Sequence, residues 1–351
     1  MRAARVTEHG SPLDIQDRER PNPGPNEVIV EMKSCGVCHS DVGIRRGTLP
    51  TTDPPFTMGH EPMGVVAERG DRVTGVSVGS RVSVNPMVTC GECYYCVRGR
   101  DDLCERWRAG TDPYGTIGRD RNGGFAEYLR APAKNLVELP DSVSDAIGSI
   151  LVDACATSFN SVSTVDFEYG DSTVVYGVGG LGSCAVKYLS QSDHLKLIAV
   201  DVNDSALTRA QRLGADRTID ASERDPVATL WEMTERGVDV AFEFTGSPEV
   251  MENAVRSVRP AGTVVITGCA EHSWEVPGAK LCLDAVEIVG SHGFTHTQIG
   301  TVIQLIDEGT IQFEDILTHE FPLSEVNTAI DILEDPSQID EEVGRITISF
   351  E

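Results

Sequence analysis

Residues 172–182 read STVVYGVGGLG, and this stretch decides the fold of the second half of the chain. An apolar run leads into glycines with G-x-G-x-x-G spacing, and a helical pattern follows. At a strand-to-helix turn, Gly177 permits the tight turn, Gly179 lets a pyrophosphate approach the backbone, and Gly182 lets helix and strand pack closely. The N-terminus of the helix, with Gly180 and Leu181, would then face the phosphates. The stretch therefore predicts a dinucleotide site.

The next apolar run, LIAVD, ends in Asp201. A carboxylate at the end of the second strand can accept hydrogen bonds from an adenosine ribose and would repel a 2′-phosphate. Asp201 therefore favours NAD over NADP.

Strand-like and helical segments alternate on both sides of this motif. Short apolar runs separated by helices of 10 to 13 residues are typical of right-handed βαβ units in a parallel sheet. The expected strands are 172–178, 195–201, 238–246, 262–268 and 286–291, and the expected helices are 181–191, 204–214 and 248–258. We therefore expect a doubly wound parallel sheet of the Rossmann type.

The first 150 residues have a different pattern. Short β-like runs at 27–32, 64–70 and 81–86 are broken by Gly, Pro and Asp, which indicates an irregular, mostly antiparallel β domain. A chain of 351 residues is long enough for two domains with separate cores. The fold class expected is therefore α/β, with a parallel-sheet domain beside a mostly antiparallel one.

The charge is strongly acidic. The chain has 29 Lys plus Arg against 55 Asp plus Glu, a net charge of −26, and lysine occurs only at positions 33, 134, 187, 196 and 280. An acidic surface with few lysines is typical of halophilic, haloarchaeal-type proteins, because molar salt screens self-repulsion. An acidic protein from a low-salt cell is the alternative. Either surface is a poor partner for nucleic acid or an anionic membrane.

Targeting signals are not evident in the sequence. The N-terminal residues lack the apolar core of a signal peptide, and apolar runs stay short of a membrane span. We expect a soluble cytoplasmic protein, in which ten cysteines serve as metal ligands, catalytic thiols or core residues rather than disulfides.

Four cysteines lie within residues 90–104, in a C-x2-C-x2-C-x7-C pattern. Four thiolates can complete a tetrahedral zinc site with no open position, which makes such a site structural. An iron–sulfur cluster is the alternative, but the wide last gap and the lack of a following Cys-Pro disfavour a ferredoxin-type run. The expected ligands are Cys90, Cys93, Cys96 and Cys104.

The segment CGVCHSD at 35–41 has three interpretations: a redox C-x-x-C pair, a haem-attachment C-x-x-C-H, or metal ligands. The lack of an export signal disfavours haem. Elsewhere GHEPMG supplies His60 and Glu61, and LVDACATS supplies Asp153 and Cys155. A thiolate, an imidazole and a carboxylate form a mixed set that leaves a zinc position open for water or substrate. The spacing alone does not show that these residues meet.

In their order along the chain, these motifs resemble those of the medium-chain zinc-dependent alcohol dehydrogenases. The similarity covers essentially the whole length and includes Gly59-His60-Glu61 with Gly64, Gly70 and Val73 behind it. It also includes GVCHSD (36–41), the four-cysteine segment, GGFAEY (123–128), the glycine motif, FEFTG (242–246), GSHG (290–293) and GRITISF (344–350).

The resemblance implies roles for the residues of the second metal group. Cys38, His60 and Asp153 would ligate a catalytic zinc, and Glu61 would enter the coordination shell when water leaves. Many relatives have Cys in place of Asp153, and Cys155 is the rival ligand, although the spacing to Thr157 favours Asp153. Cys35 would be a buried bystander.

Further roles follow from the same resemblance. Ser40 would accept the proton of the substrate hydroxyl, and Asp41 would orient His60. His39, Thr245 and Arg345 would contact the cofactor, with His39 and Arg345 at the pyrophosphate.

The resemblance also implies three segments: a GroES-like catalytic domain with the structural zinc at 1–154, an NAD-binding domain at 155–291, and a return to the catalytic domain at 292–351.

The resemblance implies reversible oxidation of an alcohol to an aldehyde or ketone by NAD, in a dimer or tetramer. Two departures are visible: Gly43 stands where many relatives complete the proton relay with His, and Ala206 where they often carry Lys or Arg. Two alternatives remain at this point, a polyol or sugar dehydrogenase on the same scaffold and an NAD-binding protein without turnover.

Overall fold

A computed structural model describes residues 1–110, 112–192, 196–269, 273–339 and 341–350. The chain divides into two compact units, Met1–Ala156 with Phe294–Glu351, and Thr157–Gly293. In the residues described, no helix combines the length and apolarity needed to cross a bilayer.

The second unit is built on a sheet that has six parallel strands among the described residues, in the order β13-β12-β11-β14-β15-β16. Numbered from β11, this is the 3-2-1-4-5-6 order of a doubly wound dinucleotide-binding fold. The strands are β11 (Ser172–Tyr176), β12 (Lys196–Asp201), β13 (Arg217–Asp220), β14 (Val238–Glu243), β15 (Val258–Ile266) and β16 (Glu287–Gly290).

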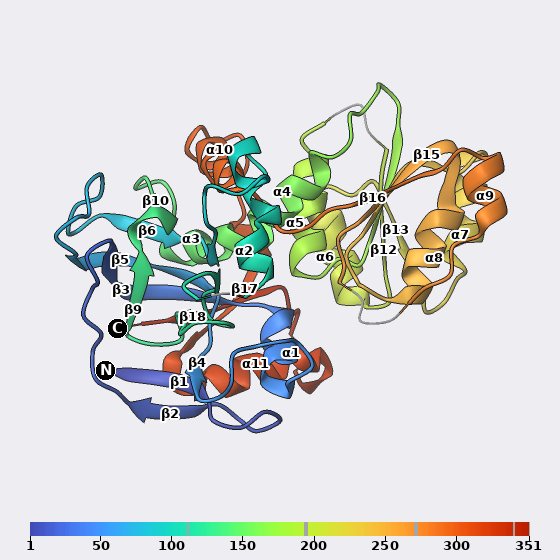
Figure 1. Ribbon diagram of the computed structural model, residues 1–351. Helices are drawn as coiled ribbons and strands as arrows, with labels where there is room; N and C mark the ends of the chain where they lie inside the picture. Colours follow the sequence, from blue (N-terminus) through green and yellow to red (C-terminus); the bar gives the residue numbers. More distant parts are fainter. Residues whose placement is uncertain (111, 193–195, 270–272, 340, 351) are drawn as a thin grey trace. The chain divides into compact units, whose positions relative to one another are not determined.

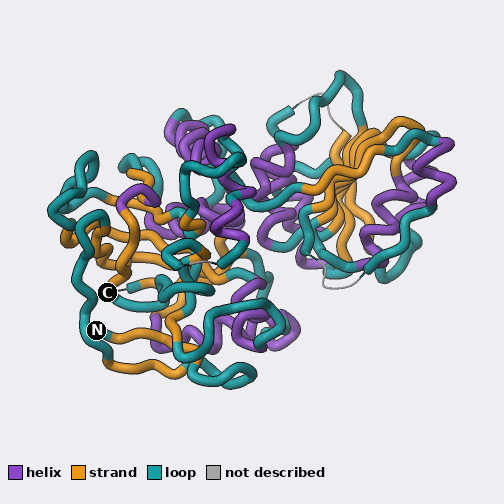
Figure 2. Tube along the Cα trace, viewed as in Figure 1, coloured by secondary structure: helices purple, strands orange, loops and turns teal. Residues whose placement is uncertain are grey.

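Helices cover both faces of this sheet, with α5 and α6 on one face and α7, α8 and α9 on the other (Figure 1; Figure 2 shows the strands between the two helical layers). Strands covered on both faces are mostly apolar, and β11 and β14 are buried along their whole length. The helices are α4 (Ala156–Val162), α5 (Gly180–Leu189), α6 (Asp204–Arg212), α7 (Pro226–Thr234), α8 (Pro248–Ser257) and α9 (Gly278–Leu283).

The first unit is mostly antiparallel. Its largest sheet follows the order β10-β6-β5-β3-β18-β17, with β9 also paired to β3, and only β17 and β18 run parallel among the described pairs. The strands are β1 (Arg2–Val6), β2 (Asp14–Asp17), β3 (Glu27–Val37), β4 (Phe56–Thr57), β5 (Glu61–Arg69), β6 (Arg81–Val84), β7 (Met87–Val88), β8 (Gly115–Thr116), β9 (Tyr128–Pro132), β10 (Leu136–Glu138), β17 (Leu317–Pro322) and β18 (Arg345–Ser349).

Several helices belong to this unit, and α3 and α11 among them pack against its largest sheet. The helices are α1 (His39–Arg46), α2 (Glu105–Arg108), α3 (Asp145–Ile150), α10 (His296–Asp307) and α11 (Val326–Glu334), and a π-helical turn, η4 (Leu151–Cys155), follows α3 directly. Alternate residues at the start of β3 (Val28, Val30 and Met32), together with Val66 of β5, belong to a core shared with β18 and α11. Because β3 is held in this core, its last residues and the start of α1 have a fixed position.

The predicted fold class is confirmed: an α/β chain with one parallel doubly wound sheet and one mostly antiparallel β unit. Strand β13 and helix α7 were not predicted. β13 has four residues with one buried side chain, and α7 buries only Pro226 and Leu230, so neither carries a strong periodic signal.

Candidate metal centres and cofactor loop

Four residues that are distant in sequence meet in the first unit. Cys38 caps the start of α1, His60 and Glu61 stand at the start of β5, and Asp153 lies in the π-helical turn. One ligand atom from each lies within 4.8 Å of the others. π-Helical turns are frequent at functional sites because the extra residue redirects a side chain. Cys155, in the same turn, is buried and is not part of the group.

A single buried carboxylate positions two members of this group. Asp41 Oδ2 accepts a hydrogen bond from the backbone N–H of Cys38 at 2.9 Å, and Asp41 Oδ1 lies 3.1 Å from His60 Nδ1. The imidazole Nε2 is thereby directed at the group, 3.9 Å from Asp153 Oδ2 and 3.1 Å from Ser40 Oγ. A metal-bound histidine typically donates a hydrogen bond from the N–H of its second ring nitrogen to such a carboxylate.

Glu61 forms a buried ion pair with Arg345. Its Oε2 accepts from the Arg345 guanidinium, whereas Oε1 has no hydrogen-bond partner among the described residues. Burial raises the pKa of Glu61 to about 8, although the charge of Arg345 opposes the increase. A Cβ on residue 36 would lie 2.0 Å from Oε2, so the pair requires Gly36. The sequence predicted Arg345 at the pyrophosphate and missed this pair, because β5 and β18 are joined only through β3.

The donor set fits a zinc ion. One thiolate, one imidazole and one carboxylate leave a fourth tetrahedral position open, which is the arrangement of a catalytic rather than a structural site. The unbonded oxygen of Glu61 fits a carboxylate that can approach the same ion. Cys35 is buried at 0% exposure, and His39 is exposed.

The protonation of the ligands predicts that zinc binding at this site depends on pH. Burial and then the charge of Asp153 raise the pKa of Cys38; burial would lower the pKa of His60, but the adjacent Asp41 carboxylate raises it well above its usual value. Zinc binds the deprotonated forms, so protons compete with it and its affinity falls as the pH falls. We expect about 10⁴-fold weaker binding at pH 6 than at pH 8 if two protons are released over this range, and about 100-fold if one is released.

Chelator competition at both pH values measures this difference, and calorimetry in two buffers counts the protons released. Equal affinity at the two pH values would contradict the prediction.

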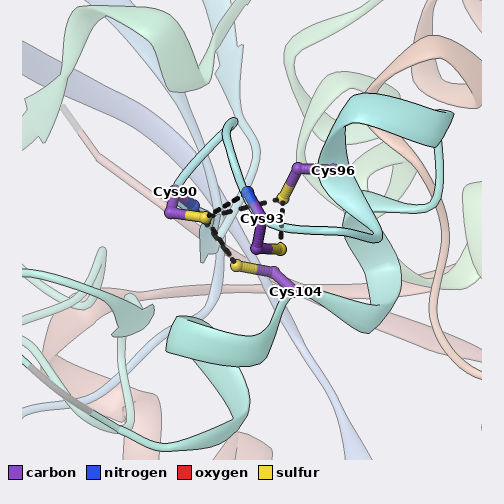
Figure 3. A group of neighbouring side chains, drawn as sticks. All are labelled: Cys90, Cys93, Cys96 and Cys104. Carbon is purple, nitrogen blue, oxygen red and sulfur yellow. Dashed lines mark hydrogen bonds between the residues drawn. The ribbon is translucent and has the colours of Figure 1, made fainter.

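The second metal group is the four-cysteine segment (Figure 3). The sulfur atoms of Cys90 and Cys96 lie 3.9 Å apart, those of Cys93 and Cys96 3.5 Å, and those of Cys104 and Cys90 3.6 Å. Zn–S bonds of about 2.3 Å put the sulfurs of a tetrahedral site about 3.8 Å apart. The segment contains only the short 3₁₀ turns Cys96–Arg98 and Asp101–Leu103 among its described residues, so four thiolates around one ion would hold it together.

The glycine-rich loop of the second unit has the geometry predicted for a dinucleotide site. Gly177 has a φ of +83°, which favours glycine, and a Cβ on residue 182 would lie 1.8 Å from the Gly177 carbonyl oxygen. The space around Gly179 is open, with no atom within 4 Å of a Cβ placed there. Helix α5 begins at Gly180, and exposed Thr245 packs its methyl group against Gly177.

Asp201, at the end of β12, holds the same loop. Its Oδ2 accepts from the Val178 N–H at 2.7 Å, and its Oδ1 accepts from the N–H groups of Val202 and Asn203 at 2.8 and 3.0 Å. Each carboxylate oxygen can accept two hydrogen bonds, so Oδ2 keeps one free position for a ribose hydroxyl.

Sequence comparison connects both units to known proteins. Residues 24–141 match the family described as alcohol dehydrogenase GroES-like domain, and residues 180–308 match the zinc-binding dehydrogenases. An alcohol dehydrogenase of Geobacillus stearothermophilus is 32% identical over 94% of this chain and 95% of its own length.

The chain belongs to the family of NAD-dependent, zinc-containing alcohol dehydrogenases.

Two archaeal members of this family show the same full-length similarity. The NAD-dependent alcohol dehydrogenase of Saccharolobus solfataricus is 30% identical over 98% of this chain and 99% of its own. The crystal structure of the Aeropyrum pernix alcohol dehydrogenase superposes with a TM-score of 0.90 at 31% identity and covers 100% of both chains. As a member, the chain is an oxidoreductase with one catalytic and one structural metal site.

Proposed function

We propose that this protein oxidises simple primary or secondary alcohols to aldehydes or ketones with NAD⁺, and catalyses the reverse reduction. The alcohol loses a hydride to the nicotinamide and a proton to solvent, so the products are a carbonyl compound, NADH and H⁺. The observation that carries the proposal is the buried group of Cys38, His60, Glu61 and Asp153, whose imidazole is directed by Asp41.

In this proposal Cys38, His60 and Asp153 hold the catalytic zinc, with Glu61 as an additional ligand. When bound, zinc supplies Lewis acidity that lowers the pKa of the substrate hydroxyl. Ser40 Oγ, 3.1 Å from His60 Nε2, accepts the hydroxyl proton. Gly43 provides no side chain to continue the relay, so water carries the proton from Ser40 to solvent.

We assign the cofactor and the second metal to the groups described above. Cys90, Cys93, Cys96 and Cys104 hold the structural zinc. The pyrophosphate would lie at Gly177–Gly182, beside Thr245 of the same unit, and the assignment of His39 and Arg345 to the cofactor rests on the resemblance to the family. Residues 1–154 and 292–351 form the catalytic domain, and residues 155–291 form the NAD-binding domain.

Turnover by purified protein tests the proposal. NADH absorbance is followed in molar KCl with zinc, with NAD⁺ and a panel of primary alcohols, secondary alcohols, polyols and aldoses. We expect activity with simple alcohols that a chelator abolishes. Activity with polyols or sugars alone would indicate that the protein is a polyol or sugar dehydrogenase. Cofactor binding without turnover on the whole panel would contradict an enzymatic function.

The preference for NAD rests on Asp201 and gives a separate prediction. In Asp201→Ser the repulsion of a 2′-phosphate is removed, together with an acceptor for the ribose hydroxyls. We expect the ratio of kcat/KM for NAD⁺ to that for NADP⁺ to fall about 100-fold, which corresponds to about 2.7 kcal/mol. Steady-state kinetics with both cofactors measure it.

Asp220 is a matched control, because it ends β13 at the position paired with Asp201. Asp220→Ser should leave the ratio unchanged, since the hydrogen bonds of the Asp220 carboxylate are local, to Ser222 and Glu223 in the turn after β13. If the ratio falls equally in both variants, the negative charge at this edge of the sheet, and not contact with the ribose, sets the preference for NAD⁺.

We also infer a halophilic, cytoplasmic homo-oligomer. The net charge of −26 and the scarcity of lysine support adaptation to molar salt, and the chain length is closer to that of tetrameric than of dimeric relatives. Light scattering and circular dichroism between 0.1 and about 3 M KCl test both points, because screening is nearly complete at molar salt. A monomer, or full stability at low salt, would contradict the corresponding inference.

A further inference from the structure

Helix α6 of the second unit carries an arginine in its interior face. Arg209 is 1% exposed and is the largest fully buried side chain in the described part of the chain. Its neighbours on the same face, Ala206 and Ala210, are small and buried, so the guanidinium has room to extend along the helix surface. A charged side chain is rarely buried unless it is hydrogen-bonded at that place.

The Arg209 guanidinium reaches the glycine-rich loop. Nη2 donates to the carbonyl oxygen of Val178 at 2.6 Å, and Nε donates to Ser183 Oγ at 3.0 Å. Ser183 Oγ in turn lies 3.2 Å from the same Val178 carbonyl. Val178 is fully buried, so this carbonyl depends on protein donors instead of solvent.

Both the N–H and the carbonyl group of Val178 are held by hydrogen bonds with side chains. Asp201 accepts from the N–H at 2.7 Å, while Arg209 and Ser183 donate to the carbonyl. Val178 stands between Gly177, with its positive φ, and Gly179, around which the space is open. Rotation of the peptide between Val178 and Gly179 would redirect the Gly179 N–H, which belongs to the surface offered to a pyrophosphate.

We propose that Arg209 is a positioning residue of the cofactor site, which holds the Val178 carbonyl so that the loop keeps the form that receives a dinucleotide pyrophosphate. The inference rests on the proposed use of NAD. It adds a residue outside the G-x-G-x-x-G motif, behind the loop and without contact to the cofactor. Because the contact is buried, molar salt screens it less than it screens an exposed lysine or arginine.

The test uses full-length protein in molar KCl and the variants Arg209→Met, Arg209→Lys and Ser183→Ala. Arg212→Met is the matched control, because Arg212 is exposed on the same helix and its loss removes the same charge. Binding of NADH is measured by fluorescence, and ADP-ribose and adenosine are measured as competitors. ADP-ribose contains the pyrophosphate and adenosine does not, so the pair separates an effect on the loop from loosening of the whole unit.

We expect Arg209→Met to weaken the binding of NADH and of ADP-ribose at least about tenfold. The affinity for adenosine should stay within about twofold of that of the wild type. Arg209→Lys and Ser183→Ala should have affinities between those of the wild type and of Arg209→Met, because each keeps part of the contact. At saturating NAD⁺ the kcat and the KM for the alcohol should stay near wild type, and Arg212→Met should match wild type throughout. If Arg209→Met does not fold, the other two variants give the same comparison.

Wild-type affinities in the Arg209 variants would overturn the proposal, as would an equal loss of adenosine binding, which would make Arg209 a general core residue. A wild-type protein that binds ADP-ribose but not NADH, or neither, would overturn the proposed function itself. The two failures are therefore distinguishable.

Discussion

Cys38→Ala should abolish alcohol oxidation while leaving the protein folded. Cys38 is the one thiol in the group with His60, Glu61 and Asp153, so its loss leaves an incomplete ligand set. Lewis-acid activation is worth several kcal/mol, and kcat/KM should fall by at least about 10³-fold. Bound zinc, measured by atomic emission, should fall from two ions per chain to one, because the four-cysteine site is unaffected.

Cys35→Ala and Cys155→Ala are the matched controls. Both thiols are fully buried and lie within a few residues of proposed ligands, but neither belongs to the metal group. Each should keep two zinc ions and most of the activity, at a modest cost in stability. Loss of one zinc ion in Cys155→Ala would give Cys155 the ligand position proposed for Asp153.

Arg345→Met should be the most destabilising single change around the metal site. Arg345 is 3% exposed and Glu61 is 0% exposed, and at pH 9, above the pKa of about 8 of Glu61, removal of Arg345 leaves the Glu61 carboxylate as an uncompensated buried charge. Breaking such a pair costs about 3–5 kcal/mol of the free energy of unfolding. Urea unfolding in molar KCl with saturating zinc measures the loss.

Two further variants separate the ion pair from lost packing. In Glu61→Gln with Arg345→Met no charge remains, so most of the lost stability should return. Arg46→Met breaks an exposed ion pair with Glu334 and should have a far smaller effect. If the double variant is as unstable as Arg345→Met, packing of the arginine stem, and not the buried charge, holds β18 to β5.

The local parts of both sites could be predicted from the sequence. The glycines at 177, 179 and 182 and the four cysteines at 90–104 lie close together along the chain, so short-range spacing restricts their geometry. The loop conformation and the sulfur distances agree with what that spacing requires. Asp201 was predicted for the same reason, since the end of the second strand must lie beside the first.

Contacts between distant segments could not be predicted in this way. Cys38, His60 and Asp153 were identified through resemblance, and their spacing alone did not show that they meet. The pair Glu61–Arg345 and the contact of Arg209 with Val178 had no sequence signal, because an arginine in a strand or a helix is read as a solvated side chain.

The sequence by itself determined the two kinds of unit, the nucleotide-binding loop and the four-cysteine site, because hydrophobic periodicity and short-range ligand spacing are local properties. Only the tertiary structure decided which buried charges face one another. Sheet order places β18 beside β3 and β3 beside β5, and the π-helical turn brings Asp153 to His60. These neighbours result from packing the whole chain around its cores, which no segment contains on its own.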